Sequence, residues 1–430
     1  MSASQTAAQL TEFARRGAGT NSERLAAGWL RDEAESGRRE ATIETFWCRP
    51  NWALAHSWHL LLGIAGSLVM VSNPTLGGAL VLVGLISILA DWLTGRSPGR
   101  RLTPEHASQN VVSHPPPTSR PAAGPNGAIE SHARADQRLH LIVTANYDAG
   151  RAGLVHRPWL RRATGVPRRL SGDGRFIPGW LGWIAIGHVW LLVVAILRYA
   201  DSGTTSSAVG ALQLIPTVVL VLALALLVES AAADFGPAAA DNAAGTAVAL
   251  ALIRALDTAP PRRLVVELVL QGAGDGQMIG LARHLRARRK ELTPANTIVL
   301  GIGPVMAGQP RWWTGDGPLV PLRYHHRLRN LAAHLADPAT GLDARPHRGR
   351  GTAPALPARV RGIPAINLGS LDAQGFAVGS HTARDTADTL DPGAVDEILQ
   401  FALMLVEAID SDLVTRTPTP AVEPATAAHL

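Results

Sequence analysis

The chain has 430 residues, of which 47% are hydrophobic and only 17% are charged. Globular domains usually carry about 25% charged residues, so we expect a soluble domain joined to a few membrane-spanning helices. This composition excludes a disordered or a collagen-like protein. Cys48 is the only cysteine, which excludes an intrachain disulfide framework and a zinc site built from several cysteines.

The formal net charge of +6 comes almost entirely from arginine, because Lys290 is the only lysine. Together with the abundant alanine, glycine and proline, this indicates a compositional bias of the genome. No motif combines basic with aromatic residues in the manner of nucleic-acid-binding proteins, so we expect no nucleic acid partner.

The first part of the chain, residues 1–50, is expected to begin a soluble domain with a helix at 24–36 and a strand at 41–47. A hairpin of two membrane spans follows within residues 51–96, with apolar runs at 54–71 and 76–93. Residues 97–137 are rich in proline, serine, alanine and glycine, which predicts a mobile linker.

The rest of the chain alternates apolar strands and helices around a second hairpin. Residues 138–175 are expected to form a buried strand at 139–145 and a basic loop, and the hairpin within 176–230 has apolar runs at 177–197 and 209–228. The main part, 231–415, alternates helices at 243–256, 277–290 and 392–409 with strands at 264–270, 297–302 and 363–368; residues 416–430 are expected to be a disordered tail. This order predicts an α/β domain with a mixed, mostly parallel sheet sandwiched by helices and interrupted by two transmembrane hairpins, four spans in all.

The arginines orient these spans. Arg96, Arg100 and Arg101 follow the second apolar run, and seven more arginines lie between residues 151 and 175, before the third. The turns within the hairpins carry almost no positive charge. The positive-inside rule therefore predicts a multi-pass protein of the plasma membrane, with membrane lipid as a partner and with the soluble domain and both termini in the cytoplasm.

Polar residues cluster where the predicted strands end or the helices begin. They lie in the segments Asn146-Tyr147-Asp148, 240–245, 272–276 and 381–386. Ligands of a doubly wound sheet bind beyond the carboxyl ends of its strands, so these segments are expected to converge. Asp241, Asp275 and His381 together would suit a divalent metal such as zinc.

The order and context of these segments resemble the M28 family of zinc aminopeptidases. The sequence reads NYD, ADNAAG, GAGDGQMIG, VLGIG and SHTARDTADTLDP where that family has its metal-binding motifs, and the last of these is the most specific. The resemblance implies a zinc-aminopeptidase fold. It also implies a site for two zinc ions, in which Asp241 would be the bridging carboxylate and Asp275 and His381 would be ligands.

Several functional positions of the family are changed in this chain. The first histidine ligand is replaced by Asn146, so that Asp148, which would orient that histidine, has lost its partner. The general base is replaced by Gly274, and an aspartate ligand by Gly301; a glycine can neither accept a proton nor bind a metal through a side chain. One metal position keeps only Asp241, and the other keeps the set of Asp241, Asp275 and His381.

These changes favour a membrane-anchored M28-like protein that is catalytically impaired or inactive and acts as a binding or scaffold protein for a peptide or protein partner. It would hold no metal, or one divalent ion such as zinc. One alternative is an active metal-dependent aminopeptidase or amidohydrolase, and another is a component of a membrane transport or cell-envelope assembly. If only side chains are missing, Asn146→His, Gly274→Glu and Gly301→Asp together should restore a two-metal site.

Simpler interpretations of the same residues remain open. Asp241 is a favoured residue for the N-cap of the helix that begins at Ala243. Asp275 with Gly276 would suit a turn, and His381 with Asp385 a hydrogen-bonded loop. Because the second hairpin separates Asp148 from Asp241, we also expect the site to lie close to the membrane.

Overall fold

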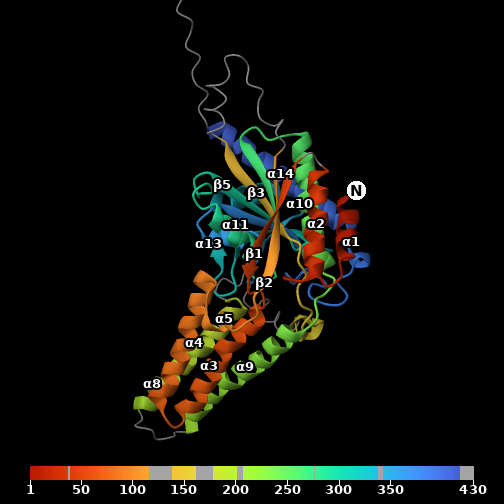
Figure 1. Cartoon of the computed structure of the whole chain (residues 1–430). Coiled ribbons are helices and arrows are strands. Elements are labelled where there is room, and N and C mark those ends of the chain that lie inside the picture. The colour runs from red at the N-terminus through yellow and green to blue at the C-terminus, as the bar shows by residue number, and fades with distance from the viewer. Residues whose placement is uncertain are drawn as a thin grey trace, which may run out of the picture.

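The structure is a computed structural model that describes residues 1–36, 39–115, 138–160, 178–200, 207–275, 277–337 and 342–416. It comprises an α/β domain and a bundle of long helices that projects from one end of that domain (Figure 1). The expected linker at 116–137, most of the basic loop and the tail from 417 onward lie outside the described residues.

The domain is built on a nine-stranded sheet with the order β1-β2-β4-β3-β5-β9-β6-β7, in which β8 pairs with β6. The strands are β1 (Glu40–Cys48), β2 (His106–His114), β3 (Leu139–Asn146), β4 (Leu264–Gln271), β5 (Thr297–Ile302), β6 (Gln309–Asp316), β7 (Leu322–Arg323), β8 (Arg345–Arg348) and β9 (Ala365–Leu371). The four central strands β4, β3, β5 and β9 are parallel, and their run of buried Val, Ile and Leu is typical of strands covered on both faces.

Helices cover both faces of this sheet. One face packs against α1 (Ala3–Thr11), α2 (Asn21–Glu35), α10 (Ala244–Thr258), α12 (His326–Leu335) and α14 (Pro392–Arg416). The other face packs against α11 (Ile279–Ala287) and α13 (Leu356–Val360). Alternate residues of β3 serve the two cores: Leu141 and Val143 face the first layer, and Ile142 faces the second. The predicted α/β class is confirmed.

Two predictions about the sheet were wrong. It is mixed but not mostly parallel, because four of its eight described pairings are antiparallel. Part of the expected linker forms helix α5 (Pro98–Arg101) and strand β2. The polar residues of β2 are not typical of a buried strand, so the sequence did not predict it. Neighbouring elements provide hydrogen-bond partners for several of these side chains: Ser108 donates to Glu23, and Asn110 donates to the Gly280 carbonyl. Pairing with β1 and β4 thus overrides the local composition.

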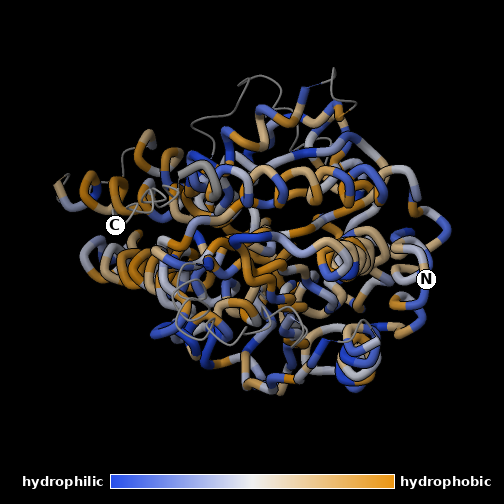
Figure 2. The backbone as a smooth tube through the Cα atoms, turned by 90° about the horizontal axis from the view of Figure 1, so that it is seen from above, coloured by the Kyte–Doolittle hydropathy of each residue, from blue (hydrophilic) through white to orange (hydrophobic). Residues whose placement is uncertain are grey.

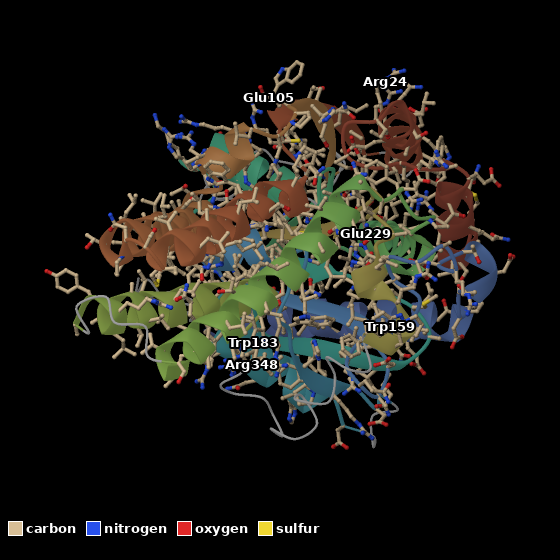
Figure 3. The ribbon with its side chains drawn as sticks, turned by 90° about the horizontal axis from the view of Figure 1, so that it is seen from below. Arg24, Glu105, Trp159, Trp183, Glu229 and Arg348 are labelled. Carbon is tan, nitrogen blue, oxygen red and sulfur yellow. The ribbon has the colours of Figure 1, made fainter. Side chains whose placement is uncertain are left out.

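The bundle consists of α3 (Trp52–Met70), α4 (Pro74–Thr94), α8 (Trp180–Ala200) and α9 (Ser207–Ala232). The hairpin α3–α4 is inserted between β1 and β2, and the hairpin α8–α9 between β3 and α10. Small residues let the helices approach closely: a Cβ on Gly66 of α3 would lie 2.7 Å from the Gly77 carbonyl oxygen of α4. Apolar residues predominate along these projecting helices (Figure 2), and Trp183 lies on the outer side of α8 (Figure 3).

Five helical segments among the described residues are long and apolar enough to cross a membrane. Four are the bundle helices, which correspond to the four predicted spans. The fifth, Ala239–Thr258, contains α10 and is 78% buried within its most apolar window. Since its side chains pack into the core beneath the sheet, we assign it to the α/β domain.

A buried charge network fixes α11 to the sheet. His284 of α11 places Nδ1 2.9 Å from Glu44 Oε2 of β1 and Nε2 3.2 Å from Glu267 Oε1 of β4. Burial lowers the pKa of His284, but the hydrogen bonds and charges of Glu267 and Glu44 outweigh burial and raise the pKa to about 9. Burial likewise raises the pKa of Glu267, but His284 and Arg288 outweigh it and bring the pKa to about 2.

This network predicts a pH-dependent stability. The pKa of His284 is raised above its ordinary value of 6.5, so its contribution is complete below pH 6.5 and is lost as the pH rises through about 9. The pKa of Glu267 is lowered from 4.5, so its contribution is complete above pH 4.5 and is lost as the pH falls toward 2. Thermal unfolding of the detergent-solubilised protein should therefore show a midpoint that falls between pH 6.5 and 9.

The variant His284→Gln should lose most of this fall, whereas His334→Gln, at an exposed position on α12, should keep it. An unchanged pH dependence in His284→Gln would contradict the assignment.

Candidate functional site

Asp241, Asp275 and His381 converge at the end of the domain that faces the bundle. Asp241 lies in the π-helical turn η3 (Ala239–Ala243), Asp275 in the turn after β4, and His381 in the loop between β9 and η5 (Ala387–Thr389). His381 Nε2 lies 2.9 Å from Asp241 Oδ2 and 3.6 Å from Asp275 Oδ1. The side chains are 14 to 19% exposed, so the cluster is accessible from one side.

Two further carboxylates hold the turns that carry these residues. Asp385 accepts hydrogen bonds from the backbone N–H groups of Ala240, at 2.7 Å, and of Asp241, at 3.4 Å. Asp148 accepts them from Gly274, at 2.7 Å, and from Asp275, at 3.2 Å. Asp148 thus shapes the turn that carries Asp275.

The backbone of these turns is strained. Among the described residues, six non-glycine residues have a positive φ, and five of them lie in the segments that carry the three site residues: Ala238, Ala273, Gln277, Met278 and His381. Such conformations cost about 1 kcal/mol or more each and concentrate at functional sites, as do π-helical turns. The strain indicates that the surrounding structure fixes the positions of these side chains.

The structure also bears on the simpler interpretations of Asp241, Asp275 and His381 as residues of a helix cap, a turn and a loop. The residue before α10 is Ala243, and no side chain caps that helix, so the prediction that Asp241 is its N-cap was wrong. Asp385 bonds to backbone N–H groups of the Asp241 turn. Asp275 does lie in a turn, but its side chain faces His381; residue 276 lies outside the described part of the chain.

Neighbouring residues also contact the rest of the His381 ring. Its Nδ1 lies 3.2 Å from the carbonyl oxygen of Arg151, and its ring stacks on His156 with 4.3 Å between centroids. A Cβ on Gly150 would lie 2.2 Å from the His381 ring, so only glycine fits there. Because Nδ1 faces a carbonyl, Nε2 is the nitrogen presented to the two carboxylates, with either a proton or a lone pair.

The electrostatics of the cluster are unequal. Burial raises the pKa of Asp241, but the charge and hydrogen bond of His381 outweigh it and bring the pKa to about 2. Burial raises the pKa of Asp275, and the charge of Asp241 adds to the effect. Burial and Asp241 also raise the pKa of Asp385 to about 6. Asp241 thus stays ionised beside His381, whereas Asp275 accepts a proton more readily.

Sequence reasoning missed several residues around this cluster. A cavity of about 180 Å³ opens beside Asp275 and His381, and it is lined in part by Asn51 and Trp52 at the start of α3 and by Ser230 near the end of α9. The Trp52 side chain forms a hydrogen bond with Asp275. Near Ser230, Glu229 (Figure 3) accepts a hydrogen bond from the Leu154 N–H at 2.8 Å. Both hairpins therefore contribute to the site.

The donor set fits one metal position and not a second. Asp241, Asp275 and His381 offer two carboxylates and an imidazole, which suit zinc, although no group of three such side chains among the described residues is spaced to hold an ion as it stands. At the other position, a Cβ on Gly301 would lie 2.2 Å from Asn367 Oδ1. A Cβ on Gly274 would lie 2.4 Å from the Asn146 Cβ. Neighbouring residues therefore occupy the space that the missing side chains would need.

Comparisons with known proteins agree with this fold. Residues 228–406 match the family model described as peptidase family M28. The zinc aminopeptidase of Bacillus subtilis is 11% identical, with a TM-score of 0.50 over 94% of this chain and 93% of that one. The glutaminyl cyclase of Porphyromonas gingivalis is 12% identical, with a TM-score of 0.49 over 94% and 96% of the two chains. No curated protein sequence matches. Residues 228–406 are therefore similar to the M28 peptidase family.

The crowding at the lost positions changes the expectation for repair. Asn146→His, Gly274→Glu and Gly301→Asp together should not restore a two-metal site, because the new side chains at 274 and 301 meet atoms that already fill the space. We expect the triple variant to bind no more zinc per chain than the parent and to unfold at a lower temperature, since overpacking typically costs about 1–3 kcal/mol. Elemental analysis after dialysis against zinc, together with a thermal melt, measures both. A second zinc ion per chain would contradict this prediction.

Proposed function

We propose that this protein is a membrane-anchored member of the M28 family that no longer hydrolyses peptides and uses the remnant cleft to bind a peptide or protein partner. One observation carries the proposal: Gly274 stands where the family has its general base, and the Asn146 side chain fills the space beside it. No carboxylate of that position is then available to take a proton from an attacking water.

The cleft retains groups that can bind without catalysis. Asp241 and Asp275 place carboxylate oxygens beside a cavity that reaches Trp52, Arg151 and His156. A peptide amino terminus would pair with the carboxylates, while the aromatic and basic side chains would contact the adjoining residue. Because the cleft also borders both hairpins, a partner embedded in or attached to the same membrane would reach it most directly.

A specific observation favours a second candidate, a hydrolase that uses a single metal. The Nδ1 of His381 faces a backbone carbonyl and its Nε2 faces two carboxylates, an arrangement that suits a metal-ligating histidine. Asp241, Asp275 and His381 would hold the ion, which would supply Lewis-acid activation of a carbonyl or of water. The Asp241–His381 contact of 2.9 Å would have to open to admit it.

Membrane anchoring rests on the four bundle helices. Each has 19 to 26 residues, enough for the roughly 20 that a span requires. Many of their large apolar side chains are exposed, such as Leu68, Ile196 and Leu214 at 62 to 67%. Exposed apolar surface of this extent calls for a lipid covering. The arginines flanking the domain end favour a cytoplasmic position for that end, and with it for the α/β domain.

The proposal predicts an absence of aminopeptidase activity. The purified full-length protein, supplied with zinc, manganese or cobalt, should hydrolyse aminoacyl-nitroanilides no faster than its His381→Ala variant. Loss of the general base alone should lower the rate by roughly 10²–10⁴-fold. Asp372→Asn, a change outside the cleft, provides a matched control for effects of the purification. Metal-dependent turnover that clearly exceeds the His381→Ala background would favour the single-metal hydrolase instead.

The orientation can be tested by thiol labelling. Cys48 is buried, so it gives a low background in intact cells. Ser72→Cys, in the turn between α3 and α4, should react with a membrane-impermeant maleimide added outside, because this turn lies at the far end of the hairpin. Ser2→Cys should react only after the cells are opened. The reverse pattern would contradict the predicted orientation.

A further inference from the structure

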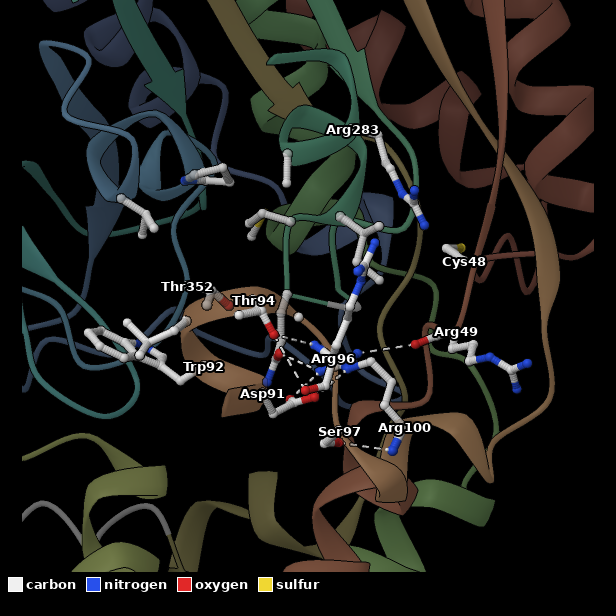
Figure 4. Close-up of a pocket in the computed structure, with 18 of the residues that line it drawn as sticks. Cys48, Arg49, Asp91, Trp92, Thr94, Arg96, Ser97, Arg100, Arg283 and Thr352 are labelled. Carbon is white, nitrogen blue, oxygen red and sulfur yellow. Dashed lines mark hydrogen bonds and ion pairs between the residues drawn. The ribbon is translucent and has the colours of Figure 1, made fainter. Parts of the chain in front are cut away.

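A second and larger cavity lies where the bundle meets the domain (Figure 4). Its volume is about 540 Å³, and its walls come from the end of α4, from α5, from the start of α11 and from α13. It is separate from the remnant M28 cleft and shares no lining residue with it. Seven arginines line it, against two acidic residues: Arg49, Arg96, Arg100, Arg101, Arg283, Arg286 and Arg361, against Asp91 and Glu105.

Both acidic residues are already paired. Arg100 binds Asp91 through two hydrogen bonds, at 2.9 and 2.7 Å, and Arg49 lies 3.5 Å from Glu105. These pairs build the wall of the cavity, as Figure 4 shows for Arg100 and Asp91. Among the described residues, no ion pair to a carboxylate joins the other five arginines, which leaves an excess of positive charge inside one concave surface.

These five arginines come from both sides of the cavity. Arg96 follows α4, Arg101 is the last residue of α5, Arg283 and Arg286 lie on α11, and Arg361 follows α13. In Figure 4, Arg96 and Arg283 reach toward the same space. Burial, and then the charge of Arg286, lowers the pKa of Arg361. Converging cations without a countercharge define a site for an anion, and guanidinium groups match phosphate oxygens in pairs.

The position of the cavity relative to the bilayer indicates the source of the anion. Helix α4 has 21 residues and is therefore roughly 31 Å long, close to the hydrocarbon thickness of a bilayer. Its carboxyl-terminal end, where Arg96 follows, would then lie among the headgroups. Trp92, Leu93 and Leu181 line the same cavity, and Leu93 is 63% exposed. The cavity therefore has a basic wall that suits a phosphate headgroup and an apolar wall that suits acyl chains.

We propose that this cavity binds the phosphate headgroup of an anionic phospholipid from the adjacent leaflet. The headgroup lies between the arginines that follow α4 and those of α11, and the first carbons of the acyl chains lie against Trp92 and Leu93. The bound lipid joins the bundle to the domain, because its phosphate contacts both. The inference rests on the membrane anchoring proposed above but not on the activity of the M28 cleft.

The test measures lipid binding to the full-length protein in a neutral detergent. Native mass spectrometry counts the bound molecules while phosphatidylglycerol or phosphatidylcholine is titrated. We expect phosphatidylglycerol to bind at least tenfold more tightly. The triple variant Arg96→Gln/Arg283→Gln/Arg286→Gln should weaken its binding by roughly 100-fold, since each arginine near a headgroup contributes about fivefold.

A matched control removes the same charge elsewhere. Arg262→Gln/Arg289→Gln/Lys290→Gln also lowers the net charge by three, but none of these residues lines the cavity. We expect this control to bind phosphatidylglycerol almost as the parent does. The lysine triple at positions 96, 283 and 286 should retain an intermediate affinity, because it keeps the charge and loses the paired geometry. If the triple glutamine variant does not fold, the three single glutamine variants provide the test, and each should bind phosphatidylglycerol about fivefold more weakly.

Three outcomes would overturn the proposal. They are equal affinity for the two lipids, an equal loss in the control triple, and binding of glycerol phosphate alone as tight as that of phosphatidylglycerol. The third would assign the cavity to a soluble phosphate ester. A failure of the anchoring itself would be seen separately, as release of the protein from membranes by an alkaline carbonate wash.

Discussion

The geometry of the M28 cleft depends on two buried carboxylates that bind backbone rather than substrate. Asp385 and Asp148 each accept two N–H groups, from the turns that carry Asp241 and Asp275 respectively. The fully buried Arg16 lies among them and donates to the carbonyls of Tyr147, Pro237 and Ala238. Its charge offsets theirs, although burial lowers the pKa of Arg16 to about 10. Burial raises the pKa of Asp148 well above its usual value. Even as ordinary hydrogen bonds, at about 0.5–1.5 kcal/mol each, two bonds to each turn help to offset the strain of its backbone.

This framework holds the turns of the cleft without the side chains that the M28 resemblance would place at positions 274 and 301. The carboxylates that shape the turns are present, and so are Asp241, Asp275 and His381, whereas glycines stand at those two positions. The space beside these glycines is not empty: Asn146 packs on Gly274, and Asn367 on Gly301. A glycine beside a vacant space would leave the lost function recoverable by one substitution. A glycine against a packed neighbour requires coordinated changes, so substitution of Gly274 or Gly301 alone would not add a side chain without moving its neighbours.

The sequence predicted the α/β class, the four apolar helices and the convergence of Asp241, Asp275 and His381, because these depend on long periodic runs and on motifs at strand ends. It did not predict β2, whose polar Ser108 and Asn110 become satisfied only through tertiary partners, nor the antiparallel edges of the sheet, which depend on pairings distant in sequence. Arg16 and Trp52 were also missed, since neither lies in a motif and each reaches the site only through the fold.

The two hairpins make the bundle part of the domain rather than an appendage. One enters between β1 and β2 and the other between β3 and the Asp241 turn, so both connect to strands that carry the cleft. The start of α3 brings Trp52 to Asp275, and the end of α4 brings Asp91 to Arg100, which also donates to Gln277 in the Asp275 turn. Any displacement of α4 relative to the domain must therefore break the Arg100 bonds or move the turn that carries Asp275. Arg100 and Gln277 thus connect the wall of the arginine-lined cavity with the segment that carries Asp275.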